Sequence, residues 1–219
     1  MTRRQAAITS LLPKCRTLAD VGCDHGYFTK YALDNGLCEF AFFSDVSAKC
    51  LHKAEVLLKE EIAAGRCAPI VCDGLSGYPY VPECVLIAGM GGEEIVKILS
   101  PVQLPEFFLL QPMKNADKVR RFLLSRGVTV TADFLVQDGT FYEIIAGHGR
   151  GTDTYTEREI LFGRDNLRAP SRDFYEMLLR EQTKLRAIAK RALSKEARRE
   201  VDEKRKRIEE LANEIAKNL

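Results

Sequence analysis

The sequence predicts an α/β protein, with a parallel sheet covered by helices on both faces, a terminal antiparallel hairpin and a separate α-helical hairpin. Three observations predict this fold class. Short apolar runs alternate with helical patterns through residues 1–165, Asp138-Gly139 joins two strand-like runs, and glycine, proline and cysteine are absent after residue 170. We therefore expect two domains, residues 1–165 and residues 166–219.

The first domain is expected to begin with a helix over residues 3–12 that ends at Pro13. Apolar runs then alternate with helical patterns, as in strands that are buried by helices on both faces. The predicted strands cover residues 17–22, 39–46, 68–74, 84–90 and 106–112. The predicted helices between and after them cover residues 28–35, 48–64 with Ser47 as the N-cap, 93–100 and 116–127.

The last segment has the pattern of a helical coiled-coil hairpin. Apolar residues recur at heptad spacing in two blocks, with a break near Ser194. The two blocks contain Leu178, Leu185 and Ala192, and Val201, Ile208, Leu211 and Ile215. Lysine and arginine outnumber acids after residue 170, in clusters such as residues 190–199 and 203–207. These charges can contact nucleic-acid phosphates, or they can form the solvated face of the hairpin.

The composition argues against several classes of protein. The seven cysteines form no CxxC pair, which argues against a structural zinc site and against a secreted disulfide framework. The apolar runs are shorter than the ~20 residues that span a bilayer, and the N-terminus lacks the features of a signal peptide. We expect a cytoplasmic protein with reduced thiols, no metal and no membrane association. The oligomeric state stays open, with a monomer as the working expectation.

The turn after the first predicted strand contains Asp20, Gly22, Asp24, His25 and Gly26. Glycines let a ligand approach the backbone, and the following helix offers free N–H groups. A dinucleotide site favours GxGxxG, whereas Asp24 replaces the second glycine and would repel a pyrophosphate. S-adenosylmethionine carries a sulfonium, an ammonium group and no phosphate, so the turn favours this methyl donor over NAD. Asp20 can bind the ammonium group, or it can only brace the loop.

Acids also end the next two predicted strands. Asp45, followed by Val46, has the usual place of an acid that binds ribose hydroxyls, or it is an ordinary acid at a helix start. Asp73 and Gly74 can bind the adenine amino group of the donor, or they can form a turn. The terminal antiparallel hairpin is typical of a Rossmann-like class I methyltransferase sheet, so the joint pattern predicts that fold.

Seven stretches together resemble the bacterial tRNA (adenine(22)-N1)-methyltransferase family. In chain order they are LADVGCDHGY, FFSDVS, CDGL, VLIAGMGGEEI, LLQPM, FYEI and REILFG. The tail also resembles the C-terminal coiled-coil domain of that family. The resemblance implies methyl transfer from S-adenosyl-L-methionine to N1 of an adenine, position 22, in the D-arm region of tRNA. Cys23 and Met113 differ from the serine and asparagine that many members carry there.

Methylation at N1 makes the adenine cationic, so a nearby carboxylate can stabilise the ring or take a proton from N6. Asp24 and His25 are therefore the first candidates beside the donor and the base, and Gln111 can bind an adenine edge. Alternatively, Asp24 caps a helix and Gln111 is a structural amide, while Tyr142 and Glu143 face the base or pair across strands. The expected donor-binding residues are Asp20, Gly22, Asp24, His25, Gly26, Asp45, Val46, Asp73, Gly74, Ala88, Gly89 and Met90.

The stretch AGMGG, residues 88–92, follows the fourth predicted strand. Ala88, Gly89 and Met90 can line the donor pocket, while Gly91 and Gly92 can leave room for a base flipped out of its stack and can open a helix; alternatively the stretch is only a tight turn. Three other functions stay open. They are a methyltransferase that acts on a small molecule or a protein, a non-catalytic donor-binding adaptor, and a dinucleotide-dependent dehydrogenase, against which Asp24 argues.

Overall fold

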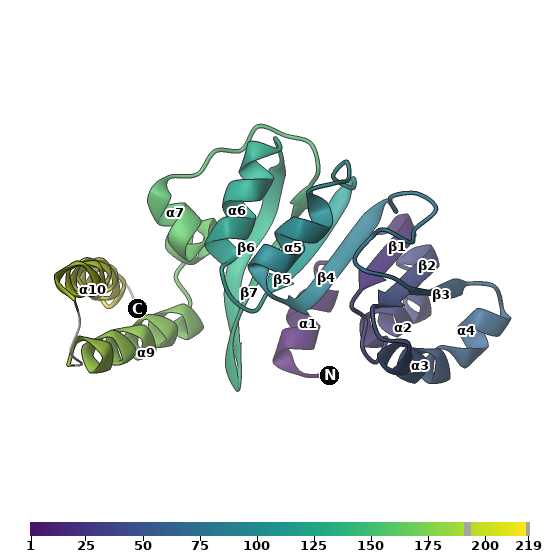
Figure 1. Ribbon diagram of the computed structural model, residues 1–219, viewed down its shortest axis with the longest axis horizontal. Helices are drawn as coiled ribbons and strands as arrows, with labels where there is room; N and C mark the ends of the chain where they lie inside the picture. The colour runs from purple at the N-terminus through teal and green to yellow at the C-terminus, as the bar shows by residue number, and fades with distance from the viewer. Residues whose placement is uncertain (191–193, 218–219) are drawn as a thin grey trace. The chain divides into compact units, whose positions relative to one another are not determined.

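The computed structural model describes residues 1–190 and 194–217, and the chain divides into two compact units, Met1–Arg164 and Asp165–Leu219. The described part of the first unit contains a seven-stranded sheet of order β3-β2-β1-β4-β5-β7-β6 (Figure 1). The strands are β1 (Cys15–Val21), β2 (Cys38–Asp45), β3 (Cys67–Val71), β4 (Cys84–Met90), β5 (Phe107–Pro112), β6 (Thr129–Asp138) and β7 (Thr140–His148).

The first five strands are parallel, and β7 lies antiparallel between β5 and β6. The hairpin turns at Gly139, whose φ of +73° is a conformation that glycine adopts without strain. The predicted Rossmann-like methyltransferase sheet with its antiparallel hairpin is therefore confirmed.

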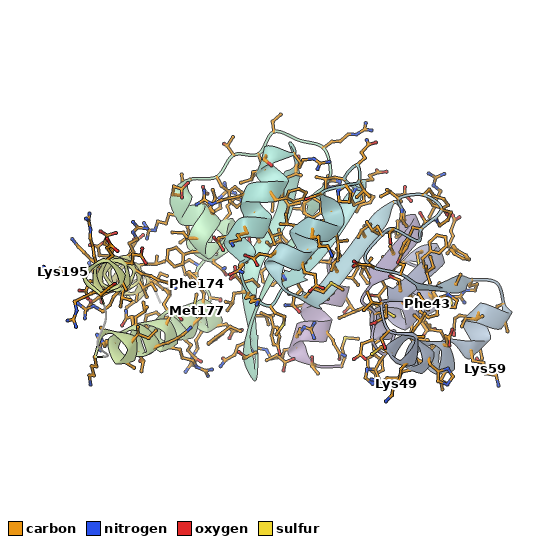
Figure 2. The ribbon with its side chains drawn as sticks, in the orientation of Figure 1. Phe43, Lys49, Lys59, Phe174, Met177 and Lys195 are labelled. Carbon is orange, nitrogen blue, oxygen red and sulfur yellow. The ribbon has the colours of Figure 1, made fainter. Side chains whose placement is uncertain are left out.

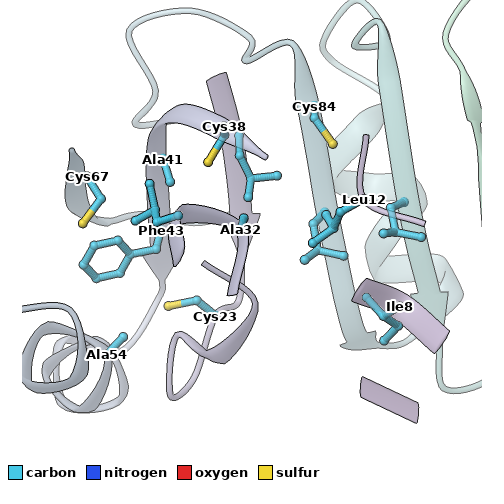
Figure 3. Packing of buried hydrophobic residues seen from close by; sticks show 14 of the residues in the cluster. Ile8, Leu12, Cys23, Ala32, Cys38, Ala41, Phe43, Ala54, Cys67 and Cys84 are labelled. Carbon is cyan, nitrogen blue, oxygen red and sulfur yellow. The ribbon is translucent and has the colours of Figure 1, made fainter. Parts of the chain in front are cut away.

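Helices cover both faces of the sheet. One face packs against Ile8 of α1, Leu33 of α2 and Leu51 of α3, and the other packs against Ile95 of α5 and Val119 of α6. Figure 3 shows part of the first cluster. The helices of this unit are α1 (Arg3–Thr9), α2 (Tyr27–Asp34), α3 (Ala48–Leu57), α4 (Lys59–Ala63), α5 (Gly92–Leu99), α6 (Ala116–Ser125) and α7 (Glu157–Phe162), and α8 (Arg164–Arg168) follows. In Figure 2, Phe43 lies inside the unit, whereas Lys49 lies on its surface.

Two predicted helices differ from the structure. The opening helix ends at Thr9 rather than Leu12. The helix expected over residues 48–64 breaks at Leu58, whose φ of −98° and ψ of 16° leave the helical region. Leu58 is fully buried, and its side chain lies where a Cβ on Gly26 would come within 3.1 Å of it. Packing of Leu58 against the first loop thus accompanies the break, which no glycine or proline announces in the sequence.

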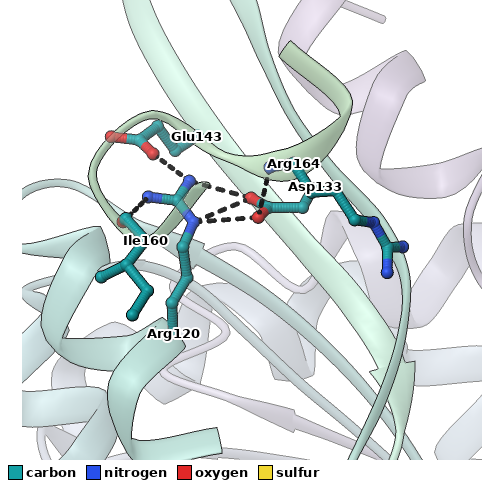
Figure 4. A network of polar contacts seen from close by, with 5 residues as sticks. All are labelled: Arg120, Asp133, Glu143, Ile160 and Arg164. Atoms are coloured by element: carbon teal, nitrogen blue, oxygen red, sulfur yellow. Dashed lines mark hydrogen bonds and ion pairs between the residues drawn. The ribbon is translucent and has the colours of Figure 1, made fainter. Parts of the chain in front are cut away.

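A buried ion network holds the hairpin to α6 (Figure 4). Arg120, which is 1% exposed, donates to both carboxylate oxygens of Asp133, to Glu143 and to the carbonyl oxygen of Ile160. Burial by itself would lower the pKa of Arg120, but the carboxylates of Glu143 and Asp133 outweigh it and raise the pKa. Glu143 therefore has a structural partner within the fold, but this partner is Arg120 on α6 and not a residue across the strands as one sequence interpretation expected.

The second unit contains α9 (Arg172–Ala189) and α10 (Lys195–Ile215), which pack on each other and form the predicted helical hairpin. Ser194 is the N-cap of α10. Five predicted apolar positions are buried, namely Leu178, Leu185, Ile208, Leu211 and Ile215. Val201 is half-buried, and Ala192 lies outside the described residues. Within the described ranges, no helix combines the length and apolar character needed to cross a membrane, and no group of three or more potential ligands could hold a metal ion.

Candidate active site at the carboxyl edge of the sheet

The carboxyl ends of β3, β2, β1, β4 and β5 lie side by side, because these parallel strands are neighbours in that order. Ligands of open α/β sheets bind outside this edge. The last residues of these strands and the loops that follow them carry the residues predicted to bind the donor, and Gln111 lies near the end of β5. The topology therefore brings the predicted residues to one edge, and their contacts decide what each can do.

The loop after β1 has an unusual backbone. Gly22, Asp24 and Gly26 have φ values of +71°, +46° and +73°. Asp24 is one of the few non-glycine residues in this conformation, which costs energy and is often found at ligand sites. The amides of Gly22 and Cys23 both donate to the carbonyl oxygen of Ser44 on β2, at 2.8 and 2.9 Å. Gly26 is the N-cap of α2 and receives no side-chain cap, so the interpretation of Asp24 as a helix cap is wrong.

Asp20 is 2% exposed at the end of β1. Its Oδ2 accepts hydrogen bonds from the hydroxyl of Thr29, at 2.8 Å, and from the amide of Thr29, at 3.3 Å. Burial raises the pKa of Asp20 to about 6, although both Thr29 contacts act in the opposite direction. At neutral pH the protein therefore carries a buried carboxylate charge directly beneath the loop.

Asp24 is the exposed acid of this loop, with 57% of its side chain accessible. Its Oδ2 lies 2.7 Å from Nδ1 of His25, and its Oδ1 accepts from Nζ of Lys53 at 3.1 Å. Slight burial acts to raise the pKa of Asp24, but the hydrogen bonds from Lys53 and His25 outweigh it and lower the pKa. The His25 ring stacks on Tyr27, with 5.5 Å between centroids. Asp24 is thus an ionised carboxylate held in place at the surface of the edge.

Acids follow β2 and β3 as predicted. One carboxylate oxygen of Asp45 accepts from the amide of Ser47 at 2.9 Å, and Val46 beside it is 68% exposed. Asp73 is exposed and pairs with Lys97 at 3.2 Å. Gly74 has a φ of +61°, and a Cβ there would lie 2.8 Å from Ile98. Gly74 therefore makes a tight turn against α5, while Asp73 is exposed and Asp45 is half-buried.

The β4 loop contacts its neighbours on both sides. A Cβ on Gly22 would lie 2.1 Å from the Met90 methyl carbon, so the Met90 side chain covers the glycine of the β1 loop. On the other side, Gly92 donates to the carbonyl oxygen of Lys114 at 2.9 Å, and a Cβ on Gly92 would lie 2.3 Å from the Asn115 oxygen. Gly92 opens α5 as predicted, but the backbone fills the space beside it, so the prediction that Gly92 leaves room for a flipped base is wrong. For Gly91, where a Cβ would lie 3.4 Å from the Lys114 side chain, it stays a prediction.

Gln111, at the end of β5, is fully buried. Its Oε1 accepts from Nε of Arg4 at 2.7 Å, and its Nε2 lies 3.5 Å from the sulfur of Met113. Arg4 also places its guanidinium 5.0 Å from the centre of the Tyr142 ring. Sequence reasoning missed Arg4, because it lies 107 positions from Gln111 and nothing local connects the two. Gln111 can contact a base only if Arg4 or Met113 moves.

A cavity of about 900 Å³ lies at the opposite, amino edge of the sheet. Its lining includes Arg16, Glu83, Glu106, His148 and Arg150, from the starts of β1, β4 and β5 and the end of β7. It shares no residue with the predicted site.

Comparison with known proteins decides the family. Residues 1–145 match a family model described as "Methyltransferase domain". The chain belongs to this methyltransferase family. The match reaches from α1 to β7, so each loop of the candidate site lies inside the methyltransferase domain. This membership rules out the dehydrogenase interpretation.

Relatives of the methyltransferase are found among named proteins and solved structures. A Mycoplasma pneumoniae protein named "Putative tRNA methyltransferase" is 32% identical over 172 residues, covering 74% of this chain and 79% of the relative. The tRNA (adenine(22)-N(1))-methyltransferase of Bacillus subtilis is 24% identical over 159 residues, covering 70% and 67%. The structure of M. capricolum TrmK with S-adenosyl-homocysteine has a TM-score of 0.88 at 20% identity, covering 97% and 98%, and shows that the two chains share a fold.

Proposed function

We propose that this methyltransferase transfers a methyl group from S-adenosyl-L-methionine to N1 of an adenine in tRNA, position 22 of the D-arm region. The observation that carries the proposal is the match to the Mycoplasma pneumoniae relative, whose name specifies a tRNA methyltransferase. The Bacillus subtilis relative, named for the adenine 22 N1 reaction, supports the choice of atom and position. A tRNA substrate also agrees with the expected cytoplasmic location.

The chemistry of the carboxyl edge fits S-adenosyl-L-methionine. This donor supplies an electrophilic methyl group on a positively charged sulfur. Three carboxylates lie at the carboxyl ends of β1 and β2. Asp20 is buried at the end of β1, Asp24 is ionised and exposed in the loop after β1, and Asp45 has one oxygen bound to Ser47. Negative charge in this place favours a cationic ligand and disfavours a diphosphate.

Each donor-binding role remains a proposal for a named residue. Asp20 attracts the donor's ammonium group through its buried charge, and Asp45 binds the ribose hydroxyls with its second oxygen. The adenine moiety of the donor lies near the β3 end. The remaining contacts are assigned to Gly22, Asp24, His25, Gly26, Val46, Asp73, Gly74, Ala88, Gly89 and Met90.

Asp24 and His25 are the proposed catalytic pair. N1 of adenine is neutral before the reaction and shares a positive charge after it, so a fixed carboxylate stabilises the charge that develops. His25 holds the Asp24 carboxylate through the 2.7 Å contact, and Lys53 keeps it ionised. The base must leave its stack to present N1 at this edge. Gln111 stays a candidate for the adenine edge, but its burial makes it dependent on Arg4.

The proposal is tested by methyl transfer from labelled donor to unmodified tRNA transcripts, with the product mapped by primer-extension stops. We expect one stop at adenine 22 for the wild type and no transfer for Asp24→Ala. Asp34→Ala is the matched control, because Asp34 is similarly exposed and also pairs with a lysine, at 2.6 Å from Lys30. Transfer to a small molecule or a protein, or donor binding without any transfer, would replace the proposal with one of its alternatives.

We also propose that α10 contacts tRNA phosphates. Lys195, Arg198 and Lys206 are exposed on this helix, and the ion pair of Lys206 with Glu210, at 4.0 Å, is loose. Surface pairs of this kind contribute little stability, so phosphates can replace them. Changing the three cations to glutamine should weaken tRNA binding and reduce the dependence of log K on log salt by up to about 0.9 per lost contact. Lys59→Gln, on the exposed side of α4, is the control, and unchanged affinity in the triple variant would remove α10 from the interface.

A further inference from the structure

Arg4 reaches the carboxyl edge of the sheet from the first turn of α1, and three contacts fix it there. Its Nε donates to Oε1 of Gln111 at 2.7 Å, and its amide donates to Oδ2 of Asp138 at 3.0 Å. Its guanidinium lies over the Tyr142 ring, 5.0 Å from the centroid. A cation stacked on an aromatic ring and held through Nε has lost most of its rotamer freedom before any ligand arrives.

The rest of the Arg4 guanidinium has donors to spare. Its two Nη groups make no hydrogen bond within the described parts of the chain. Burial lowers the pKa of this half-buried side chain. Arginine stays protonated even so, because its ordinary pKa is above 12. Nη2 faces Gly89, where a Cβ would lie 3.3 Å from it, and the Gly89 φ of +87° presents backbone without a side chain. A fixed cation whose donors are free of protein partners at a ligand-binding edge is available to bind an anionic group.

We propose that Arg4 is an anion-binding residue of the active site, whose free Nη groups bind a carboxylate or phosphate oxygen beside Gly89. The inference rests on the proposed function, which supplies two sources of that oxygen. One is the carboxylate of the donor's methionine moiety, and the other is a phosphate of the tRNA nucleotide that enters the site. The planar fork of arginine suits either group through charge-assisted hydrogen bonds.

Gln111 acquires a different role in this arrangement. It is buried, and its acceptor oxygen is already used by Arg4, so it is a positioning residue that sets the direction of the Arg4 fork. Glutamate at position 111 keeps an acceptor for Nε of Arg4, whereas methionine does not. The pair Gln111→Glu and Gln111→Met therefore separates loss of positioning from loss of packing.

The first experiment measures ligand binding by calorimetry with two probes, S-adenosyl-homocysteine and 5′-methylthioadenosine. The second probe keeps the nucleoside and the sulfur but lacks the amino-acid moiety. If Arg4 binds the donor carboxylate, Arg4→Gln should weaken the binding of S-adenosyl-homocysteine by about tenfold or more and leave the binding of 5′-methylthioadenosine unchanged. Gln111→Met should show the same selective loss, and Gln111→Glu should restore it. Arg3→Gln, from the neighbouring exposed position, is the control.

The second experiment measures tRNA methylation kinetics. If Arg4 binds a phosphate, Arg4→Gln should raise KM for tRNA about tenfold with little change in kcat, while S-adenosyl-homocysteine binding stays normal. Urea unfolding verifies that each variant is folded. The inference is overturned if folded Arg4→Gln matches the wild type in both experiments. A wild type that methylates tRNA would then leave the proposed function standing, whereas a wild type that binds neither probe overturns both.

Discussion

Replacing Asp20 with asparagine should stabilise the unliganded protein at neutral pH. Asp20 is 2% exposed, and burial raises its pKa from the usual 3.8 to about 6. The two Thr29 contacts end on one carboxylate oxygen, and the side-chain oxygen of asparagine can accept both. Asp20→Asn therefore removes the buried charge and keeps the hydrogen bonds.

The size and sign of the effect follow from linkage. A carboxyl group whose pKa is higher in the folded state contributes stability that is fully present below pH 3.8 and is lost as the pH rises through about 6. The difference between the two pKa values, at about 1.4 kcal/mol per pH unit, amounts to about 3 kcal/mol above pH 6. Asp20→Asn should gain up to about this much free energy of unfolding near pH 7.5, and almost none near pH 4.

Urea unfolding followed by circular dichroism at both pH values checks this prediction. Asp133→Asn is an instructive contrast, because Asp133 is also fully buried but is paired with Arg120, at 2.8 Å. That variant should lose stability rather than gain it. Equal stabilities of Asp20→Asn and the wild type at pH 7.5 would show that the Asp20 charge carries no folding cost, and the reasoning would fail.

Two further variants test the packing around the site. Arg120→Met should lower the free energy of unfolding by about 3–5 kcal/mol in urea titrations, because it leaves Asp133 buried without its cation. Arg121→Met, which removes an exposed ion pair, is the control and should lower the free energy of unfolding far less. Gly92→Ala should lower the melting temperature and the methyl-transfer rate together, because its Cβ would lie 2.3 Å from the carbonyl oxygen of Asn115. A normal melting temperature for either Arg120→Met or Gly92→Ala would contradict the contacts that we describe.

The parts of this fold that the sequence predicts are those with a local signal. Each strand is an apolar run, and Asp138-Gly139 predicts the hairpin. The acids after β1, β2 and β3 could be assigned to one site because parallel neighbours end at one edge. Asp24 and Asp45 could therefore be predicted as site residues from their positions relative to the strands alone.

The rest depends on contacts between distant residues. The contact of Arg4 with Gln111 joins the first helix to the fifth strand, and no pattern of period 2 or 3.6 encodes it. The break at Leu58 has no glycine or proline signal in the sequence, and it is accompanied by packing of Leu58 against Gly26, 32 positions earlier in the chain. The close approach of Gly92 to the β5 loop has the same origin, because a glycine in a sequence shows freedom but not which backbone lies beside it.

Three features that favour a ligand occur at the same edge of the sheet. Asp20 is charged and buried, Asp24 has a φ of +46°, and Arg4 keeps donors without partners in the described part of the chain. By contrast, the buried charges of Arg120 and Asp133 satisfy each other within the protein. A sequence selected for stability alone would have removed the buried charge of Asp20 and the positive φ of Asp24, while a ligand with a cationic end and an anionic group can bind to the charges of Asp20 and Arg4. The placement of these features therefore favours a binding role for the edge independently of any likeness to other proteins.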